Sequence, residues 1–275
     1  MSCTPAPEAS TTAPTAASST AVATVVSTPM PTSWPGAAAT SSAVLAPLDV
    51  VIAVRNEARG LPPLLADLAR APSGLVRDVL VIDGGSSDGS QRLARLAGAR
   101  LHSAEAGRGR QLVQGVAASG APWLLLLHGD GRLPPDWSEL VARAMAGGAA
   151  TAWAFRLAIA GGDPRLQLVA WAANGRSRWR QLPYGDQGLL LARSLHDAAG
   201  GIAPLPLMED LEFVLRLRRH GAIRLLDGRL SVQERRWRAL GVWRTTWINA
   251  RLRRRWRRGE DPLRLAAAYY GRGGG

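Results

Sequence analysis

The sequence contains no lysine and only one cysteine, Cys3. A single cysteine excludes a disulfide framework and a cysteine-based metal site, so a reducing cytoplasm is the expected compartment. Because lysine is missing, the net charge of +13 comes from arginine alone. Guanidinium groups bind phosphates and anionic surfaces through paired hydrogen bonds, which favours an anionic ligand or partner.

Long hydrophobic runs are also missing. No apolar stretch approaches the roughly 20 residues that a membrane-spanning helix needs. The longest uninterrupted runs, such as 121–127, have the length of a buried strand. With 275 residues, of which 47% are hydrophobic, the chain can still bury one sizeable core.

The composition divides the chain into three parts. Residues 1–46 are mostly Ala, Ser, Thr and Pro with Glu8 as the only charge, which predicts a disordered tail because little apolar surface can be buried. This tail lacks the basic start and long apolar stretch of a signal peptide. Residues 47–240 are predicted to form the globular domain, and 241–275 a basic, tryptophan-containing helical segment.

Strands and helices alternate along the first half of the domain, which predicts an α/β fold with a mostly parallel sheet flanked by helices. The predicted strands there are 49–54, 78–83, 99–102 and 123–128. The predicted helices are 61–71, one from about residue 90, 109–118 and 137–145. The second half is less regular, with strands at 149–159, 188–192 and 223–226 and helices at 164–178, 209–220 and 241–258.

Asp83 follows the continuous apolar run 79–82, which is typical of a strand buried on both faces. Ligands of open α/β sheets bind at the carboxyl ends of such strands. The glycine- and serine-rich loop 84–87 would let a ligand approach the backbone, so Asp83 could accept a hydrogen bond from a base or ribose. The alternative is a turn aspartate, and Asp88 is the better candidate for a structural cap.

His128 and Asp130 end the apolar strand 123–128. Being two residues apart, they would point to the same side of an extended backbone. A carboxylate there could hold Mg²⁺ or Mn²⁺, which would neutralise a diphosphate leaving group, and an imidazole suits Mn²⁺ better. The alternative is a core histidine followed by a turn aspartate.

Glu209 and Asp210 open a predicted helix whose buried side begins with Leu211. The helix dipole alone favours acidic residues in a first turn. Two adjacent carboxylates are more than a cap needs, however. If Asp210 faces a pocket, it could take a proton from an acceptor hydroxyl as a general base, and the second acid would tend to raise its pKa.

Arginine is concentrated in two further segments. Arg108 and Arg110 stand among glycines just before a helix, where amides and guanidinium groups could bind phosphate, although an ordinary loop is the alternative. Residues 235–258 hold ten arginines, four tryptophans and no acid. This composition favours a helix lying on anionic lipid, with a core-packing helix as the close alternative and nucleic acid as the least favoured partner.

Together these residues resemble a family 2 glycosyltransferase with the GT-A fold, a Rossmann-related sheet, from about residue 48 to 237. Asn56-Glu57 after the first strand and the Asp83 turn are similar to the family's nucleotide-binding segments, which implies that Glu57, Asp83, Arg108 and Arg110 contact the nucleotide. His128-Gly129-Asp130 stands where the family has Asp-x-Asp, so the resemblance implies Asp130, with His128, as the site of a divalent metal.

Glu209-Asp210 resembles the family's Glu-Asp pair, which implies Asp210 as the base of an inverting transfer with Glu209 beside it. The usual Asn is replaced by Val113. The 107–111 loop and the 185–188 segment look most like the radical-SAM/selenodomain-associated transferase subgroup.

The segment 233–237 fits the Gln-x-x-Arg-Trp pattern of processive family members, in which the Trp stacks on the acceptor sugar. Those enzymes carry membrane spans, so a processive polymerase is not expected here. The resemblance implies an acceptor-binding group, which we expect to consist of Gln187, Gln233, Arg236 and Trp237.

The expected function is therefore transfer of a sugar from a nucleotide-diphosphate sugar to a hydroxyl acceptor, with Mn²⁺ or Mg²⁺ as cofactor. A lipid-linked acceptor and peripheral contact with the inner face of the cell membrane are further expectations, and no nucleic-acid partner is expected. Two alternatives stay open. One is a nucleotidyltransferase that makes a nucleotide sugar, and the other is a non-catalytic binding module at an anionic surface.

Overall fold

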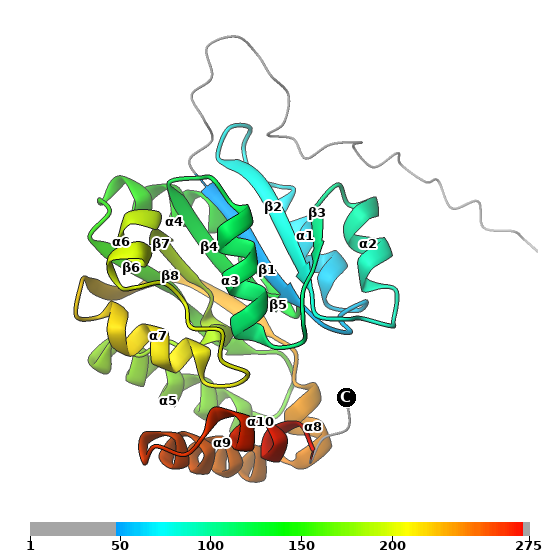
Figure 1. Cartoon of the computed structure of the whole chain (residues 1–275), viewed down its shortest axis with the longest axis vertical. Coiled ribbons are helices and arrows are strands. Elements are labelled where there is room, and N and C mark those ends of the chain that lie inside the picture. Colours follow the sequence, from blue (N-terminus) through cyan, green and yellow to red (C-terminus); the bar gives the residue numbers. More distant parts are fainter. Residues whose placement is uncertain (1–47, 272–275) are drawn as a thin grey trace, which may run out of the picture.

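A computed structural model describes residues 48–271, apart from the side chain of Arg236 (Figure 1). The predicted tail 1–46 and the last four residues lie outside this range. The fold is a single eight-stranded sheet in the order β3-β2-β1-β4-β7-β6-β8-β5, with helices on both faces. Four neighbouring pairs of strands are parallel and three are antiparallel, so the sheet is mixed.

The parallel part comes from the first half of the chain, as the sequence predicted. Its strands are β1 (Leu48–Val54), β2 (Val76–Asp83), β3 (Arg100–Ser103) and β4 (Trp123–His128). All seven residues of β1 are buried, because this strand lies between β2 and β4 and is covered on both faces. The carboxyl ends of β1, β2 and β4 therefore meet at one edge of the sheet.

The other strands are β5 (Gly131–Arg132), β6 (Thr151–Ile159), β7 (Leu189–Ala192) and β8 (Ala222–Val232). β7 is antiparallel to both β4 and β6, and β8 is parallel to β6. The predicted last strand, 223–226, was too short, because β8 has eleven residues. Its exposed side carries Arg224, Asp227 and Arg229, and these charges interrupt the apolar run that the prediction relied on.

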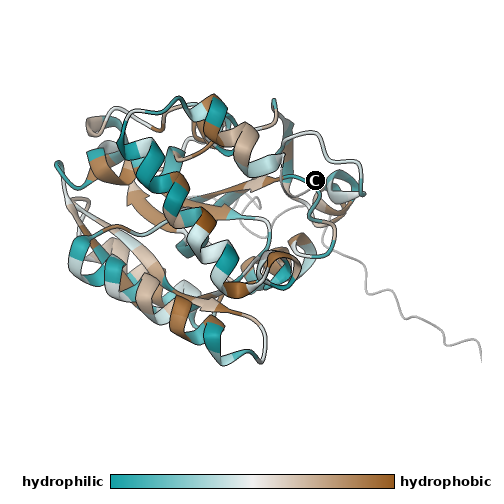
Figure 2. Cartoon of the chain, turned by 90° about the horizontal axis from the view of Figure 1, so that it is seen from below, coloured by the Kyte–Doolittle hydropathy of each residue, from teal (hydrophilic) through white to brown (hydrophobic). Residues whose placement is uncertain are grey.

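Successive side chains of β1 point to opposite faces and so belong to two cores. Val50 and Ile52 pack with α1 and α4, whereas Val51 and Ala53 pack with α3 and α7. In Figure 2 the central strands are largely brown, while the surrounding helices alternate between brown and teal.

The helices up to residue 217 are α1 (Leu61–Leu68), α2 (Ser90–Leu96), α3 (Arg108–Ala118), α4 (Trp137–Ala146), α5 (Pro164–Arg180), α6 (Arg193–Ala198) and α7 (Glu209–Leu217), with a short 3-10 turn, η1 (Gly185–Gln187).

Three helices follow β8: α8 (Arg235–Leu240), α9 (Val242–Arg257) and α10 (Pro262–Tyr270). They lie together at one end of the molecule, next to α5 and α7 (Figure 1). Leu252 of α9 and Leu265 of α10 form a small core with Leu207, which lies two residues before α7. None of the helices between residues 48 and 271 has both the length and the apolar character that a bilayer crossing requires.

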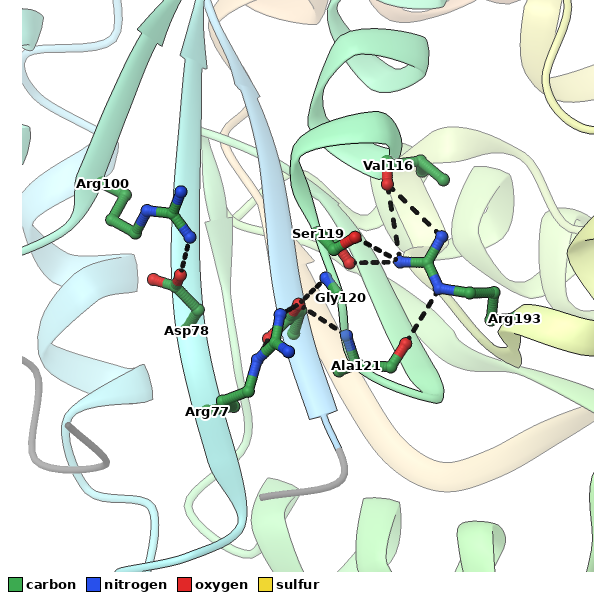
Figure 3. Close-up of polar contacts among 9 residues, drawn as sticks. Arg77, Asp78, Arg100, Val116, Ser119, Gly120, Ala121 and Arg193 are labelled. Carbon is green, nitrogen blue, oxygen red and sulfur yellow. Dashed lines mark hydrogen bonds and ion pairs between the residues drawn. The ribbon is translucent and has the colours of Figure 1, made fainter. Parts of the chain in front are cut away.

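The opposite edge of the sheet, where β1 and β4 begin, is held by buried polar contacts. Asp49 is fully buried and accepts hydrogen bonds from the backbone of Gly120 and Ala121 and from the guanidinium of Arg77. Arg193 bonds to backbone oxygens of Ser119 and Ala121 at 3.0 Å (Figure 3). These contacts hold α3, β1 and β4 together at this edge. Ligands are therefore expected at the other edge of the sheet.

Candidate active site

The carboxyl ends of β1 and β4 open into a pocket of about 1190 Å³ that is in contact with solvent. The first residues of α3 and α7 form its sides, and α9 and α10 close it from the C-terminal part of the chain. Pockets of this kind at the carboxyl edge of an α/β sheet are the usual ligand sites of such folds. The polar and aromatic side chains that line it are those of Glu57, Arg108, His128, Asp130, Tyr184, Asp186, Glu209, Asp210, Gln233, Arg235, Trp237, Asn249, Arg253 and Tyr269.

Eight of the residues singled out in the sequence meet in this pocket, although they come from segments far apart in the chain. Three short acidic segments, after β1, after β4 and at the start of α7, converge there as the parallel topology predicts. The eight are Glu57, Arg108, His128, Asp130, Glu209, Asp210, Gln233 and Trp237.

Asp210 is held by two backbone amides. Its Oδ2 accepts a 2.8 Å hydrogen bond from the N–H of Gly185, and its Oδ1 accepts one of 2.7 Å from the N–H of Leu211. Helix α7 starts abruptly because Met208, immediately before it, adopts the left-handed conformation with φ 67°. The carboxylate therefore lies at the amino end of a helix with a fixed orientation toward the pocket.

Gly185 also packs against His128. A Cβ at residue 185 would lie 2.5 Å from Cε1 and 2.7 Å from Nε2 of the imidazole, so only glycine fits without a shift. Burial lowers the pKa of His128 well below its usual value, and the positive charge of Arg108 lowers it further. The imidazole is therefore neutral at physiological pH.

Glu209 is buried beside Asp210, with 3% of its surface exposed. Burial raises its pKa to about 7, the negative charge of Asp210 acts in the same direction, and Arg108 partly opposes both. Near neutral pH this side chain can therefore hold a proton, whereas an ordinary glutamate cannot.

Arg108 is the first residue of α3 and carries the positive charge at the centre of the pocket. Burial lowers its pKa, but the nearby Tyr269, Glu209, Tyr270 and Asp130 more than offset this effect, so the net shift is upward. A permanently charged guanidinium at a helix amino end is a good site for phosphate oxygens.

Glu57 forms an ion pair with Arg235, whose Nη2 lies 2.7 Å from both carboxylate oxygens. Burial raises the pKa of Glu57, and so does the charge of Asp130, while the Arg235 pair lowers it. The pair joins the loop after β1 to α8. Arg235 was not expected from the sequence, because nothing local signals a partner 178 residues away.

Asp130 projects into the pocket, and its carboxylate has no hydrogen-bond partner within the part of the chain that the structure describes. Those described residues contain no cluster of three or more His, Cys, Asp or Glu able to hold a metal ion. Mg²⁺ is commonly held by one or two carboxylates together with substrate phosphates and water. Asp130 fits that kind of site, in which a phosphorylated ligand completes the coordination.

Asp83 ends β2, and its Oδ2 accepts from the N–H groups of Gly85 and Ser86 and from Nε2 of Gln91 at 2.7 Å. These are the contacts of a turn aspartate, which was one of the two interpretations of Asp83 from the sequence. Its Oδ1 is buried and has no partner among the described residues. That oxygen is enclosed, however, and Asp83, with 1% of its surface exposed, is not among the residues that line the pocket.

Besides Asp83, three of the expected site residues lie outside the pocket or are not described. Arg110 is exposed and forms a surface ion pair with Glu105. Gln187 is fully buried: its Oε1 accepts from Ser177 at 2.6 Å and its Nε2 donates to the carbonyl of Phe155 at 3.0 Å. It thus anchors η1 to α5 and β6. The side chain of Arg236 is outside the described residues.

The pocket also contains side chains that were not among the expected site residues: Tyr184 and Asp186 from η1 and its flank, Asn249 and Arg253 from α9, and Tyr269 from α10. Burial raises the pKa of Asp186 to about 6, Arg176 lowers it, and Asp210 raises it. Asp186 had a signal, since the polar segment 184–188 interrupts an apolar context. The α9 and α10 residues depend on how those helices dock, which no local pattern encodes.

Known proteins resemble this chain in sequence family and in fold. The model of the family described as glycosyl transferase family 2 matches residues 49–206, more than half of the chain. The comparison with curated proteins finds no match. Among solved structures, Staphylococcus aureus TarS (residues 1–349) is 15% identical with a TM-score of 0.54, and the match covers 68% of this chain and 60% of that one.

Glucosyl-3-phosphoglycerate synthase from Mycobacterium tuberculosis, in complex with Mn²⁺, UDP and phosphoglyceric acid, is 20% identical with a TM-score of 0.51. That match covers 67% of this chain and 69% of the synthase. At these identities the two structures show the shared fold, while the family match extends over the segments after β1, β2 and β4. The chain therefore belongs to glycosyl transferase family 2 and is a glycosyltransferase.

Proposed function

We propose that the enzyme transfers a sugar from a nucleotide-diphosphate sugar to a hydroxyl of its acceptor, with inversion at the anomeric carbon and Asp210 as general base. The main support for this proposal is the position of the Asp210 carboxylate. It lines the pocket and is oriented by the N–H groups of Gly185 and Leu211. A base fixed by backbone amides can be placed against an incoming hydroxyl without a loss of side-chain freedom.

In the proposed step the acceptor oxygen forms a bond to the anomeric carbon while Asp210 takes its proton. The bond between that carbon and the diphosphate oxygen breaks, and the electron pair leaves with the nucleoside diphosphate. Arg108 is placed to offset the negative charge that develops on the leaving group. Glu209, with a pKa raised to about 7, can stay protonated beside Asp210 and so adds less negative charge there.

For the donor nucleotide, we propose contacts from Asp83 and Glu57. Asp83 ends β2 beside the end of β1, which supports a contact with the base or ribose at this edge of the sheet. TarS has been solved with UDP, and the synthase with UDP and Mn²⁺, which makes UDP the first nucleotide to test. Segments 107–111 and 185–188 also support membership of the radical-SAM/selenodomain-associated subgroup, which remains part of the proposal.

A divalent cation is the proposed cofactor. Asp130 would hold it together with the donor phosphates, and the neutral imidazole of His128 could assist. When bound, Mn²⁺ or Mg²⁺ would supply positive charge to the diphosphate. The acceptor would lie against Gln233 and Trp237. The indole N–H of Trp237 is buried with no partner among the described residues, and an acceptor oxygen would satisfy it.

Contact with an anionic membrane is a further proposal. On α9 the indoles of Trp243 and Trp247 are 54% and 58% exposed, and arginines surround them. Binding to vesicles with and without phosphatidylglycerol would test it. The double variant Trp243→Ser, Trp247→Ser should lose binding to the anionic vesicles, while Trp171→Ser, an exposed indole on α5, should keep it. Unchanged binding of the double variant would contradict the proposal.

The central proposal is tested by thermal unfolding with UDP, GDP, CDP and dTDP, each with and without Mn²⁺. A ligand at about 100 times its Kd should add about 2.7 kcal/mol of stability. We expect one nucleotide to stabilise the protein in a Mn²⁺-dependent way, and Asp130→Asn to remove that dependence. Release of a nucleoside diphosphate from the matching nucleotide sugar would then identify the reaction.

Two results would favour the alternatives. Release of pyrophosphate from a nucleoside triphosphate and a sugar phosphate would indicate a nucleotidyltransferase. Nucleotide binding without turnover, unaffected by Asp210→Asn, would indicate a non-catalytic binding module.

A further inference from the structure

Helix α9 contributes part of the wall of the pocket. Its residues Asn249 and Arg253, one helical turn apart, lie on the same side of the helix and both line the pocket. This part of the wall lies beyond residue 206, where the family match ends.

Helix α9 is firmly docked and not a loose appendage. Val242, Thr245 and Leu252 are buried, with between 1% and 6% of their surfaces exposed. Leu252 packs against Leu207 and Leu265. Because Leu252 directly precedes Arg253, the packing of the helix fixes the direction in which the Arg253 side chain leaves the backbone.

Within the described part of the chain, the positive charge of Arg253 is not balanced by an acidic residue close to it. Among the described residues, no carboxylate forms an ion pair with it, whereas Arg235 is bound to Glu57 and Arg255 to Glu260. The contact that the structure gives it is aromatic: its Cζ lies 5.2 Å from the centre of the Tyr184 ring.

A second guanidinium approaches the same ring, since Cζ of Arg176 lies 3.5 Å from its centre. Burial lowers the pKa of Arg176, Tyr184 and Asp186 oppose this shift, and the positive charge of Arg253 adds to it. Arg176 is already engaged with the carbonyl of Leu182 at 2.8 Å. Arg253 therefore still has N–H groups that can donate hydrogen bonds to a ligand.

This unpaired cation lies near the proposed base. Tyr184 precedes Gly185, whose N–H donates to Asp210, so Arg253, Tyr184 and Asp210 surround the same part of the pocket. We propose that the acceptor carries an anionic group, a phosphate or a carboxylate, close to the hydroxyl that is glycosylated, and that Arg253 and Asn249 bind this group. This inference rests on the proposed transfer to a hydroxyl acceptor.

The test uses the full chain saturated with Mn²⁺ and the nucleoside diphosphate that stabilises it most. Glycerol 3-phosphate, lactate and glycerol are then added separately, so that phosphate, carboxylate and neutral hydroxyl compounds are compared by thermal unfolding. We expect at least one anion, but not glycerol, to raise the melting temperature. In Arg253→Gln the Kd of that anion should rise about tenfold, as for the loss of one charged hydrogen bond.

Arg254→Gln is the matched control, because Arg254 is the next residue of α9 but is exposed. It should keep the affinity of the wild type for the anion. Equal effects of the two variants, or no discrimination between the anions and glycerol, would overturn the inference. So would a tenfold loss of nucleotide affinity in Arg253→Gln, which would make Arg253 a donor ligand.

Failure of the proposed function gives a different result. If no nucleoside diphosphate stabilises the wild type, the sugar-transfer proposal fails, and the anion titrations are then made without nucleotide. Anion binding that still depends on Arg253 but not on Arg254 would keep the anion site while rejecting the donor site.

Discussion

The backbone N–H of Gly185 donates a 2.8 Å hydrogen bond to Oδ2 of Asp210, so a loop glycine orients the side chain proposed as the base. The same glycine packs against the ring of His128, at the end of β4. The loop 184–188, the end of β4 and the start of α7 are thus fixed relative to one another at a single residue.

Gly185→Ala should disturb all three elements. The added methyl would lie 2.5 Å from Cε1 of His128, so the ring or the loop must move. We expect a loss of about 1 to 3 kcal/mol of unfolding free energy, as for other overpacked sites, together with slower sugar transfer. Gly162→Ala is the control, because no atom lies within 4 Å of its added Cβ. Equal stability of the two variants in urea unfolding would contradict this packing.

Asp210→Asn keeps the size of the side chain but removes the base. We expect the rate of sugar transfer to fall by about 10²- to 10⁴-fold, the usual contribution of general base catalysis, with little change in nucleotide affinity. Glu212→Gln is the control on the same helix. Glu212 pairs with Arg216 outside the pocket, so its variant should retain the wild-type rate. A fall of less than tenfold in Asp210→Asn would exclude this carboxylate as the base.

Glu209 should make the protein less stable as the pH rises. Its pKa is raised from 4.5 in the unfolded chain to about 7, so between these values the folded protein binds more protons than the unfolded one. The corresponding stability is present below about pH 4.5 and is lost as the pH rises through 7. Urea unfolding of wild type and Glu209→Gln at pH 5 and pH 8 would measure it.

The wild type should lose more stability than Glu209→Gln over that interval, because the amide does not titrate. Equal pH dependence in the two proteins would mean that Glu209 ionises in the folded state like an exposed glutamate.

Arg193 should stabilise the edge of the sheet opposite the pocket. It donates to the carbonyls of Ser119 and Ala121, both at 3.0 Å (Figure 3). In Arg193→Leu these partly buried acceptors lose their donors, which should reduce the unfolding free energy by about 2 to 3 kcal/mol. Arg224→Leu, an exposed site on β8, should change it by less than about 0.5 kcal/mol. Similar losses in both would show that the Arg193 contacts add nothing specific.

The sequence was sufficient for the parallel half of the sheet, because β1, β2 and β4 contain the continuous apolar runs 50–54, 79–82 and 123–127, each followed by a polar residue. It was insufficient for β8, where charges alternate with buried residues and the pairing with β6 shifts register between Ala154 and Arg156. Helix α10 lies within the segment 241–275 that was predicted to be helical, and its start has a local signal: Asp261 caps it, accepting from the N–H of Leu263, and Pro262 begins it.

The residues of the site, like the strands, could be predicted from the sequence only in part. Glu57, Asp130 and Asp210 follow strand ends or open a helix, and parallel topology brings such positions together. Arg110 and Gln187 looked equally functional by residue type, but one lies at the surface and the other is buried in the core. Arg253 had no signal beyond the basic composition of its helix, because only the docking of α9 brings it to the pocket.

That docking has a consequence for how the enzyme is made. The ribosome releases the segments that hold Asp130 long before it releases α9, so during synthesis the family-matched half of the pocket emerges without the part of the wall that α9 contributes. We therefore expect sugar transfer that depends on Arg253 to begin only after α9 has left the ribosome and docked against the pocket.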